Sequence, residues 1–324
     1  MRIGKVTENT LKRSVFKQIR TEFKGVKSAA VGKDCAFSEN GEVYSVLSTV
    51  TQNVSDPGFY AVMKAAAGLV SQGIDPDHVT LSILLPVDSE EKEIREIVSG
   101  AIEAAKTVGT VYAGGHTEVT TLVNRAVVSA SAVGFCDDPK KVLCRGRGAV
   151  GEAIIMTGFA ALEGTAMIAQ EKKSDLIARY PVPFIEEAAG FKYMLDIRQA
   201  AGIAAKCGAS SVHDISQGGV FAGLWEIAER AGAGLVADLK AIPIRQETIE
   251  ICEFFELNPY VLISGGALLI TAKDPDLMLE CFRKNDINCK VIGHLKEGND
   301  RIIINEGEER YLELPGADEV HKVL

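Results

Sequence analysis

The segment 213–219 reads His-Asp-Ile-Ser-Gln-Gly-Gly and directly precedes a stretch whose apolar residues have helical spacing. Asp214 or Ser216 can cap such a helix, and the paired glycines Gly218 and Gly219 leave its first backbone N–H groups free of side chains. Free N–H groups at a helix N-terminus attract anions. The pattern predicts either a phosphate-binding turn, with Asp214 as a candidate catalytic residue, or an ordinary capped helix.

A second segment follows a short strand-like run near Val111. Two glycines are succeeded by an imidazole, a hydroxyl and a carboxylate: Gly114, Gly115, His116, Thr117 and Glu118. Glycines at a strand end permit close approach of the backbone to a ligand. His116 and Glu118 are candidates for metal binding and for acid–base catalysis. A solvated β-turn explains the same residues equally well.

Three further positions are weaker candidates for a phosphate or metal site. Asp34 stands at the mouth of a strand and is either a magnesium ligand or a turn residue. Gly164 and Thr165 open a helix, which either receives a phosphate or simply starts there. Lys5 either reaches a phosphate or is solvated.

The composition describes a packed, acidic protein. Its 324 residues are 47% hydrophobic, and the formal net charge is −9. Such a surface argues against nucleic-acid and membrane partners. The seven cysteines include no C-x-x-C pair, so we expect reduced thiols. No signal peptide or membrane span is visible, and we expect a cytoplasmic protein.

Strand-like and helix-like runs alternate along the whole chain, which predicts an α/β or α+β fold in two layers. The length suits two domains. A polar, basic and glycine-containing stretch covers 137–150. We therefore expect an N-terminal domain at 1–145 and a C-terminal domain at 146–324.

Taken together, several segments resemble the aminoimidazole-ribotide-synthetase-like superfamily, and most of all its HypE branch, named for hydrogenase maturation. Gly32–Phe37 is similar to the Gly-Asp/Glu-Asp-Ala-Ala motif of that family. Ala113–Val119 is similar to its Gly-Gly-Asp/Glu/His-Thr motif at the end of a strand. The C-terminal half adds the similar segments 213–234, 242–245, 257–259 and 263–269. The order of these elements extends the resemblance over nearly the whole chain.

The resemblance implies an N-terminal ATP-binding domain whose sheet pairs in a homodimer, followed by a C-terminal α/β sandwich. It also implies ATP and Mg²⁺ as cofactors, and activation of a carbonyl, amide or acid oxygen by phosphorylation. The substrate would be an unidentified small molecule or protein. Asp34 would bind the metal, Gly114–Thr117 would lie by the phosphates, and Asp214, Gly218 and Gly219 would line the cleft.

The chain departs from the family pattern at expected metal ligands. Val50 stands where relatives have an acidic residue, and Gly68 stands in place of an aspartate. Neither residue can coordinate Mg²⁺. A non-catalytic dimeric binding or scaffold protein with a degenerate nucleotide site is therefore the alternative function. The segment 319–324 holds no thiol, so synthesis of a cyanide ligand on a terminal cysteine is not expected.

Overall fold

The computed structural model describes residues 3–26, 28–38, 40, 42–136, 138, 142–143 and 146–324. The chain divides into two compact units. We call Asp34–Val142 the N-terminal unit, and Met1–Lys33 together with Leu143–Val323 the C-terminal unit. The first 33 residues thus group with the C-terminal unit, whereas the sequence suggested one N-terminal domain from residue 1 to 145.

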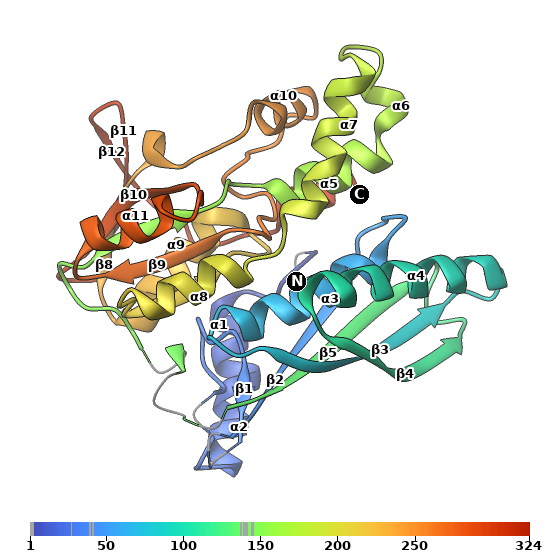
Figure 1. Cartoon of the computed structure of the whole chain (residues 1–324), viewed down its shortest axis with the longest axis horizontal. Helices are drawn as coiled ribbons and strands as arrows, with labels where there is room; N and C mark the ends of the chain where they lie inside the picture. The colour runs from blue at the N-terminus through green and yellow to red at the C-terminus, as the bar shows by residue number, and fades with distance from the viewer. Residues whose placement is uncertain are drawn as a thin grey trace. The chain divides into compact units, whose positions relative to one another are not determined.

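The N-terminal unit is built on a five-stranded sheet with the order β1-β2-β5-β3-β4 (Figure 1). Its strands are β1 (Ala36–Phe37), β2 (Val43–Val50), β3 (Pro76–Leu85), β4 (Val111–Val119) and β5 (Val127–Phe135). β3 and β4 are parallel and are joined by helix α4 (Glu91–Val108). β5 is antiparallel to β2 and β3, so β2, β3 and β4 all run in the same direction.

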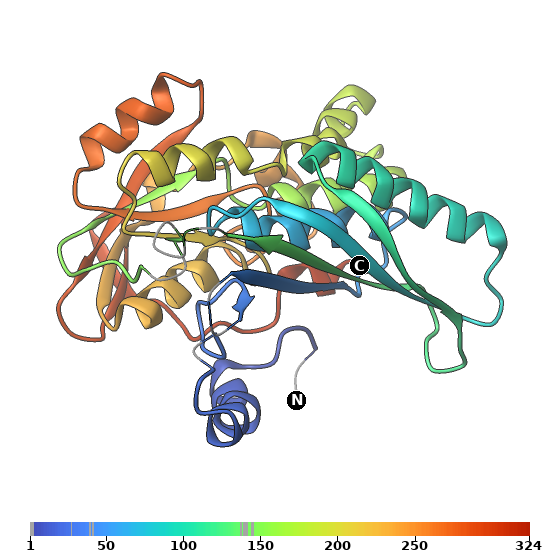
Figure 2. The ribbon, with the colours of Figure 1, turned by 60° about the horizontal axis from the view of Figure 1, so that its bottom comes forward.

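Helices α3 (Pro57–Val70) and α4 cover one face of this sheet (Figure 2). Alternate residues of β3, from Val79 to Leu85, are buried against them, as expected for a sheet with one covered face. The other face carries exposed apolar side chains, with Leu47 73% and Phe135 56% exposed. Gly109, in the left-handed conformation, ends α4 as the sequence predicts.

The first residues dock onto the C-terminal unit through a helical segment. It consists of α1 (Glu8–Leu11), the π-helical turn η1 (Lys12–Phe16) and α2 (Lys17–Glu22). Trp225 donates its indole N–H to Glu8, and the Arg301 guanidinium stacks 3.7 Å from the centroid of the Trp225 ring. Lys12 pairs with Glu229 at 2.6 Å. These contacts explain why residues 1–33 belong with the later chain.

The C-terminal unit contains a seven-stranded mixed sheet with the order β12-β11-β8-β10-β6-β9-β7. The strands are β6 (Ala153–Thr157), β7 (Ser211–Asp214), β8 (Gly234–Asp238), β9 (Leu268–Ala272), β10 (Cys289–Lys296), β11 (Arg301–Asn305) and β12 (Glu308–Tyr311).

Helices complete the C-terminal unit. Helix α9 (Gly219–Ala231) packs an apolar stripe into the main core, and α8 (Arg198–Lys206) and α11 (Pro275–Arg283) pack against each other and the sheet. A separate helical group is formed by α5 (Leu162–Glu171), α6 (Lys173–Leu176), α7 (Val182–Gly190) and α10 (Gln246–Phe254) (Figure 1). Pro181 and Pro183 lie at the start of α7, where the first backbone N–H groups need no partner within the helix.

The expectation that all cysteines are reduced is wrong. Cys207, at the end of α8, and Cys281, in α11, form a disulfide with their Cα atoms 6.8 Å apart. Four other described cysteines, Cys35, Cys136, Cys252 and Cys289, form no disulfide within the described part of the chain. Cys207 and Cys281 are 74 residues apart in the sequence, so no local pattern marks them as a pair. Within the described ranges, no helix is both long and apolar enough to cross a membrane.

Candidate functional site

The glycine pair at 114–115 lies inside a strand and not at its end, because β4 continues to Val119. The pairing with β3 shifts there: Val79 faces Tyr112, but Thr80 faces Gly114, so one extra residue bulges out. A Cβ atom on Gly115 would lie 1.8 Å from the Leu81 carbonyl oxygen. The contact with β3 therefore requires glycine at position 115, whether or not a ligand binds.

His116 and Glu118 are two residues apart on β4 and therefore project from the same face of the sheet. The His116 Nε2–H group donates to Glu118 Oε2 over 3.0 Å. Both side chains are more than half exposed. His116 lies opposite Ser82 on β3, so this pair stands on the sheet face that α3 and α4 do not cover.

Asp34 lies at the opposite edge of the same sheet. It precedes β1, and its carboxylate accepts hydrogen bonds from Gln72 Nε2 (2.6 Å) and Ser71 Oγ (3.3 Å) just after α3. With neighbouring strands about 4.8 Å apart, the width of the sheet separates Asp34 from His116 on β4. The N-terminal unit does not bring these two predicted site residues together.

The positions where the family pattern calls for carboxylates are packed with apolar groups. Val50 is completely buried. A Cβ atom on Gly68 would lie 3.0 Å from the Val46 side chain and 3.1 Å from the Asp34 carbonyl oxygen. Among the described residues, no group of three or more His, Cys, Asp or Glu side chains could hold a metal ion. The described residues therefore do not form a site that would hold Mg²⁺ by protein side chains alone.

The glycine turn before α9 receives an internal carboxylate. α9 begins at Gly219 after Gly218, which is in the left-handed conformation, so its start differs from a helix capped by Asp214 or Ser216. Asp318 Oδ2 accepts the Gly218 N–H over 2.6 Å. A Cβ atom on Gly219 would lie 2.5 Å from the Tyr260 carbonyl oxygen. A phosphate could reach this turn only after Asp318 had left it.

Asp318 is held by three backbone N–H groups, because its other oxygen, Oδ1, accepts from Val320 (2.9 Å) and Ile263 (3.2 Å). The side chain is 5% exposed. Burial raises the pKa of its carboxyl group, while the hydrogen bonds from Gly218, Val320 and Ile263 oppose that shift. The carboxylate thus links the turn before α9 to the loop at Ile263.

The N-terminus of α5 is also occupied by contacts within the protein. The Ile263 carbonyl accepts the Gly164 N–H over 3.0 Å, and Leu262 packs on Gly164. Thr165 is fully buried, and its hydroxyl bonds to Thr248 over 2.9 Å. Neither residue faces an open site in this arrangement. Their proposed contact with a phosphate remains a prediction.

Lys5 is held by an ion pair with Glu226 at 2.6 Å. Glu226 also lies 2.9 Å from Nε2 of the buried His213. Burial alone would raise the pKa of Glu226, but the charge of Lys5 and the hydrogen bond from His213 lower it to about 2. Lys5 thus has a structural partner. Asp214 ends β7 opposite Leu268 on β9, one residue from His213.

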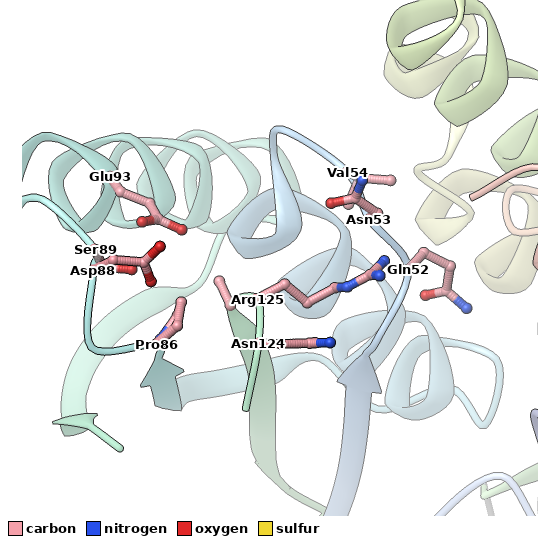
Figure 3. A pocket seen from close by; sticks show the side chains of 10 residues that line it. Gln52, Asn53, Val54, Pro86, Asp88, Ser89, Glu93, Asn124 and Arg125 are labelled. Carbon is pink, nitrogen blue, oxygen red and sulfur yellow. The ribbon is translucent and has the colours of Figure 1, made fainter. Parts of the chain in front are cut away.

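Sequence reasoning missed a pocket in the N-terminal unit. It has a volume of about 270 Å³ and lies where β2 and β3 end and β5 begins (Figure 3). Its lining comprises Gln52, Asn53, Val54, Pro86, Asp88, Ser89, Glu93, Asn124, Arg125 and Ala126. A second hollow of about 430 Å³ shares Asn124 and Arg125. Ligands of α/β sheets often bind beyond the carboxyl ends of the strands, which is the one signal that could have suggested this place.

Comparison with known proteins relates most of the chain to one family. Residues 23–136 match the N-terminal domain of AIR synthase related proteins, and residues 149–305 match the C-terminal domain. The chain is 24% identical to a putative hydrogenase expression/formation protein of Methanocaldococcus jannaschii, over 83% of this chain and 79% of that protein. It is 28% identical to a carbamoyl dehydratase HypE of Rhodobacter capsulatus, over 76% and 72% of the two chains.

One solved structure has a fold similar to that of this chain over nearly its full length. A crystal structure of the hydrogenase maturation protein HypE in complex with ATP has a TM-score of 0.72 and 15% sequence identity, and the match covers 99% of this chain and 100% of that one. The two-domain architecture expected from the sequence is thereby confirmed. With both family domains matched in order, the chain belongs to the AIR synthase related protein family.

Proposed function

We propose that this protein is an ATP-using enzyme that activates a carbonyl, amide or acid oxygen of its substrate by phosphorylation. Two similarities support this proposal: the 28% sequence identity to a carbamoyl dehydratase HypE, and the fold shared with a HypE protein solved in complex with ATP. The observation in this chain that carries the proposal is the exposed His116–Glu118 pair on β4.

The geometry of this pair suits proton transfer. The Glu118 carboxylate accepts a hydrogen bond from the Nε2–H group of His116. The unprotonated Nδ1 of the same ring can then accept a proton from an attacking group. Both side chains stand on the uncovered face of the sheet, where a substrate can reach them. We assign His116 the role of general base and Glu118 the role of orienting it. Thr117, Gly114 and Gly115 would adjoin the phosphates.

The nucleotide roles proposed for the C-terminal unit require a rearrangement. Gly218 would bind a phosphate through its N–H only if Asp318 released it. Asp214, Ser216 and Gly219 would then line the same site. We propose no step that uses Mg²⁺, because the described residues do not fit a metal site.

A non-catalytic binding protein is the second candidate. Two observations favour it: Asp318 fills the turn at Gly218, and Val50 is buried where a metal ligand would be needed. Such a protein would keep the fold and the surfaces of the family and would bind neither ATP nor Mg²⁺.

Both candidates include a homodimer formed through the part of the uncovered sheet face that carries Leu47 on β2 and Phe135 on β5, which leaves His116 and Glu118 on β4 open to a substrate. Leu47 and Phe135 expose large apolar areas on this unit, and exposed apolar groups commonly mark interfaces. Light scattering of the purified protein should give the mass of a dimer, and Leu47→Glu should shift it toward the monomer. A monomeric parent protein would contradict this part of the proposal. A cytoplasmic location stays a prediction from composition.

Calorimetry with ATP, with and without Mg²⁺, tests the enzymatic proposal. We expect measurable heat at millimolar ATP, and slow intrinsic formation of ADP. His116→Asn should reduce that rate about 100-fold, as for loss of a general base, and should leave ATP binding intact. Absence of heat at millimolar ATP would reject the enzyme and leave the binding protein.

His78→Asn is the matched control. His78 lies on the neighbouring strand β3 and pairs with the adjacent carboxylate of Asp77 at 2.9 Å. His78 and Asp77 thus form another histidine–carboxylate pair, at a position to which we assign no function. Equal rates in the His116→Asn variant, the His78→Asn variant and the parent protein would remove His116 from the reaction.

A further inference from the structure

The pocket at the ends of β2 and β3 contains polar groups that lack partners. Gln52 is 2% exposed, and its Nε2 atom is buried with no hydrogen-bond partner among the described residues. The Ser89 hydroxyl, on the same lining, is in the same state within the described chain. Buried donors left without acceptors are costly and rare. Both atoms are covered in the free protein, so a ligand in the pocket reaches them only when their side chains turn toward it.

The charged groups of this pocket stand on opposite sides. Figure 3 shows Arg125 and Asn124 extending from the start of β5 toward the loop of Gln52 and Asn53, while Asp88, Ser89 and Glu93 lie on the other side. Across the described ranges, no ion pair joins Arg125 to Asp88 or Glu93. The cation and the two carboxylates are therefore available to a ligand.

This separation of charge selects the class of ligand. A purely anionic ligand near Arg125 would be repelled by Asp88 and Glu93, and a purely cationic ligand would be repelled by Arg125. A small molecule that carries both charges satisfies all three side chains. The volume of about 270 Å³ limits it to a few heavy atoms beyond those charged groups.

We propose that this pocket binds a free amino acid, with its carboxylate on Arg125 and Asn124 and its ammonium group between Asp88 and Glu93. The Gln52 amide and the Ser89 hydroxyl, whose polar atoms are covered in the free protein, would turn toward the same molecule on binding. The site lies entirely in the N-terminal unit and uses none of the residues assigned to ATP. It goes beyond the proposed function and stands or falls independently of it.

Thermal-shift assays of the full chain with each of the twenty L-amino acids, at millimolar concentration, test the proposal. At least one amino acid should raise the melting temperature, and calorimetry should then give its affinity. Two analogues of that amino acid, one without the amino group and one without the carboxylate, should each bind at least about ten-fold more weakly. If none of the twenty shifts the melting temperature, or if both analogues bind as well as the parent amino acid, the proposal is overturned.

Charge variants locate the binding site. Arg125→Gln changes an exposed side chain and Glu93→Gln a half-buried one, and each should weaken binding about ten-fold or more without altering the fold. Arg95→Gln is the control, because Arg95 lies on α4 beside Glu91 and outside the pocket. Unchanged affinity in Arg125→Gln would overturn the assignment, as would an equal loss in Arg95→Gln. ATP binding measured on the same variants should not change, which separates this test from that of the proposed enzyme.

Discussion

In the C-terminal unit, the Gly218 N–H donates to Asp318, whereas in the N-terminal unit Gln52 Nε2 lines a pocket without an acceptor among the described residues. Both places are rich in features that bind ligands. In the first, the chain supplies its own anion. In the second, the chain leaves donors and charges unmatched. A glycine-rich turn alone therefore does not identify a ligand site; unmatched polar groups are the more direct sign.

The strongest internal link of the C-terminal unit is the disulfide between Cys207 and Cys281. It closes a loop with a sequence separation of 74 residues, for which chain entropy predicts about 4 kcal/mol of stability. Reduction, or the Cys207→Ser/Cys281→Ser double variant, should destabilise this unit by that amount in urea unfolding and leave the N-terminal unit unchanged. If reductant had no effect on the parent protein, the link would not be formed in solution.

Asp318→Ala should have the next largest effect. It leaves the buried N–H groups of Gly218, Ile263 and Val320 without their acceptor, which costs about 3 kcal/mol in total at about 1 kcal/mol each. Urea unfolding measures the loss. Asp276→Ala, an exposed change on α11, is the control. A loss below about 1 kcal/mol would mean that the Gly218 turn is not held closed by Asp318, and the contrast between the units would weaken.

The ion pair of Lys5 and Glu226 predicts a loss of stability in acid. The pKa of Glu226 falls from 4.5 to about 2 on folding. A depressed carboxyl pKa stabilises the folded state above the unfolded pKa, and this contribution disappears as the pH falls from 4.5 toward 2. At about 1.4 kcal/mol per pKa unit, it reaches up to about 3 kcal/mol.

Urea unfolding of the parent protein and of Glu226→Gln, measured from neutral pH to about pH 3, checks this expectation. The variant should be less stable at neutral pH, and its stability should fall less steeply in acid. The exposed Glu297→Gln change serves as the control. Parallel pH profiles for Glu226→Gln and the parent would contradict the assigned ion pair.

Gln52→Leu should have the smallest effect on stability and the opposite sign. Replacing the buried amide, whose nitrogen has no acceptor among the described residues, removes the desolvation cost of that nitrogen. The change also removes the long hydrogen bond of 3.3 Å from the Thr51 N–H to Gln52 Oε1, so we expect a net gain of up to about 1 kcal/mol in the free protein. The same change should weaken amino-acid binding. A loss of stability in Gln52→Leu would indicate that the amide nitrogen is satisfied in the free protein, and the pocket would lose its main distinguishing feature.

Most helices and strands could be predicted because their signals are local. The alternation of apolar residues from Val79 to Leu85 marks β3, and Gly109 marks the end of α4. β4 was predicted too short because glycines usually end strands. What keeps Gly114 and Gly115 in the strand is their pairing with β3, a contact with a separate part of the chain.

The candidate site was less predictable for the same physical reason. His116 and Glu118 were identified because their residue types suit the chemistry. The partner of Gly218 is Asp318, 100 residues later, and the partner of Lys5 is Glu226, 221 residues away. The pocket of Gln52 and Arg125 forms only when three loops meet at the end of the sheet. No local pattern carries such information.

Hydrogen–deuterium exchange of the full chain, measured with and without saturating ATP, tests the contrast between the two units most directly. Amide exchange reports the opening of individual segments. We predict slow exchange at Gly218 and Gly164 in both states, and new protection confined to segments of Asp34–Val142. Fast exchange at Gly218 in the free protein, followed by protection on adding ATP, would show an open phosphate turn and contradict the account.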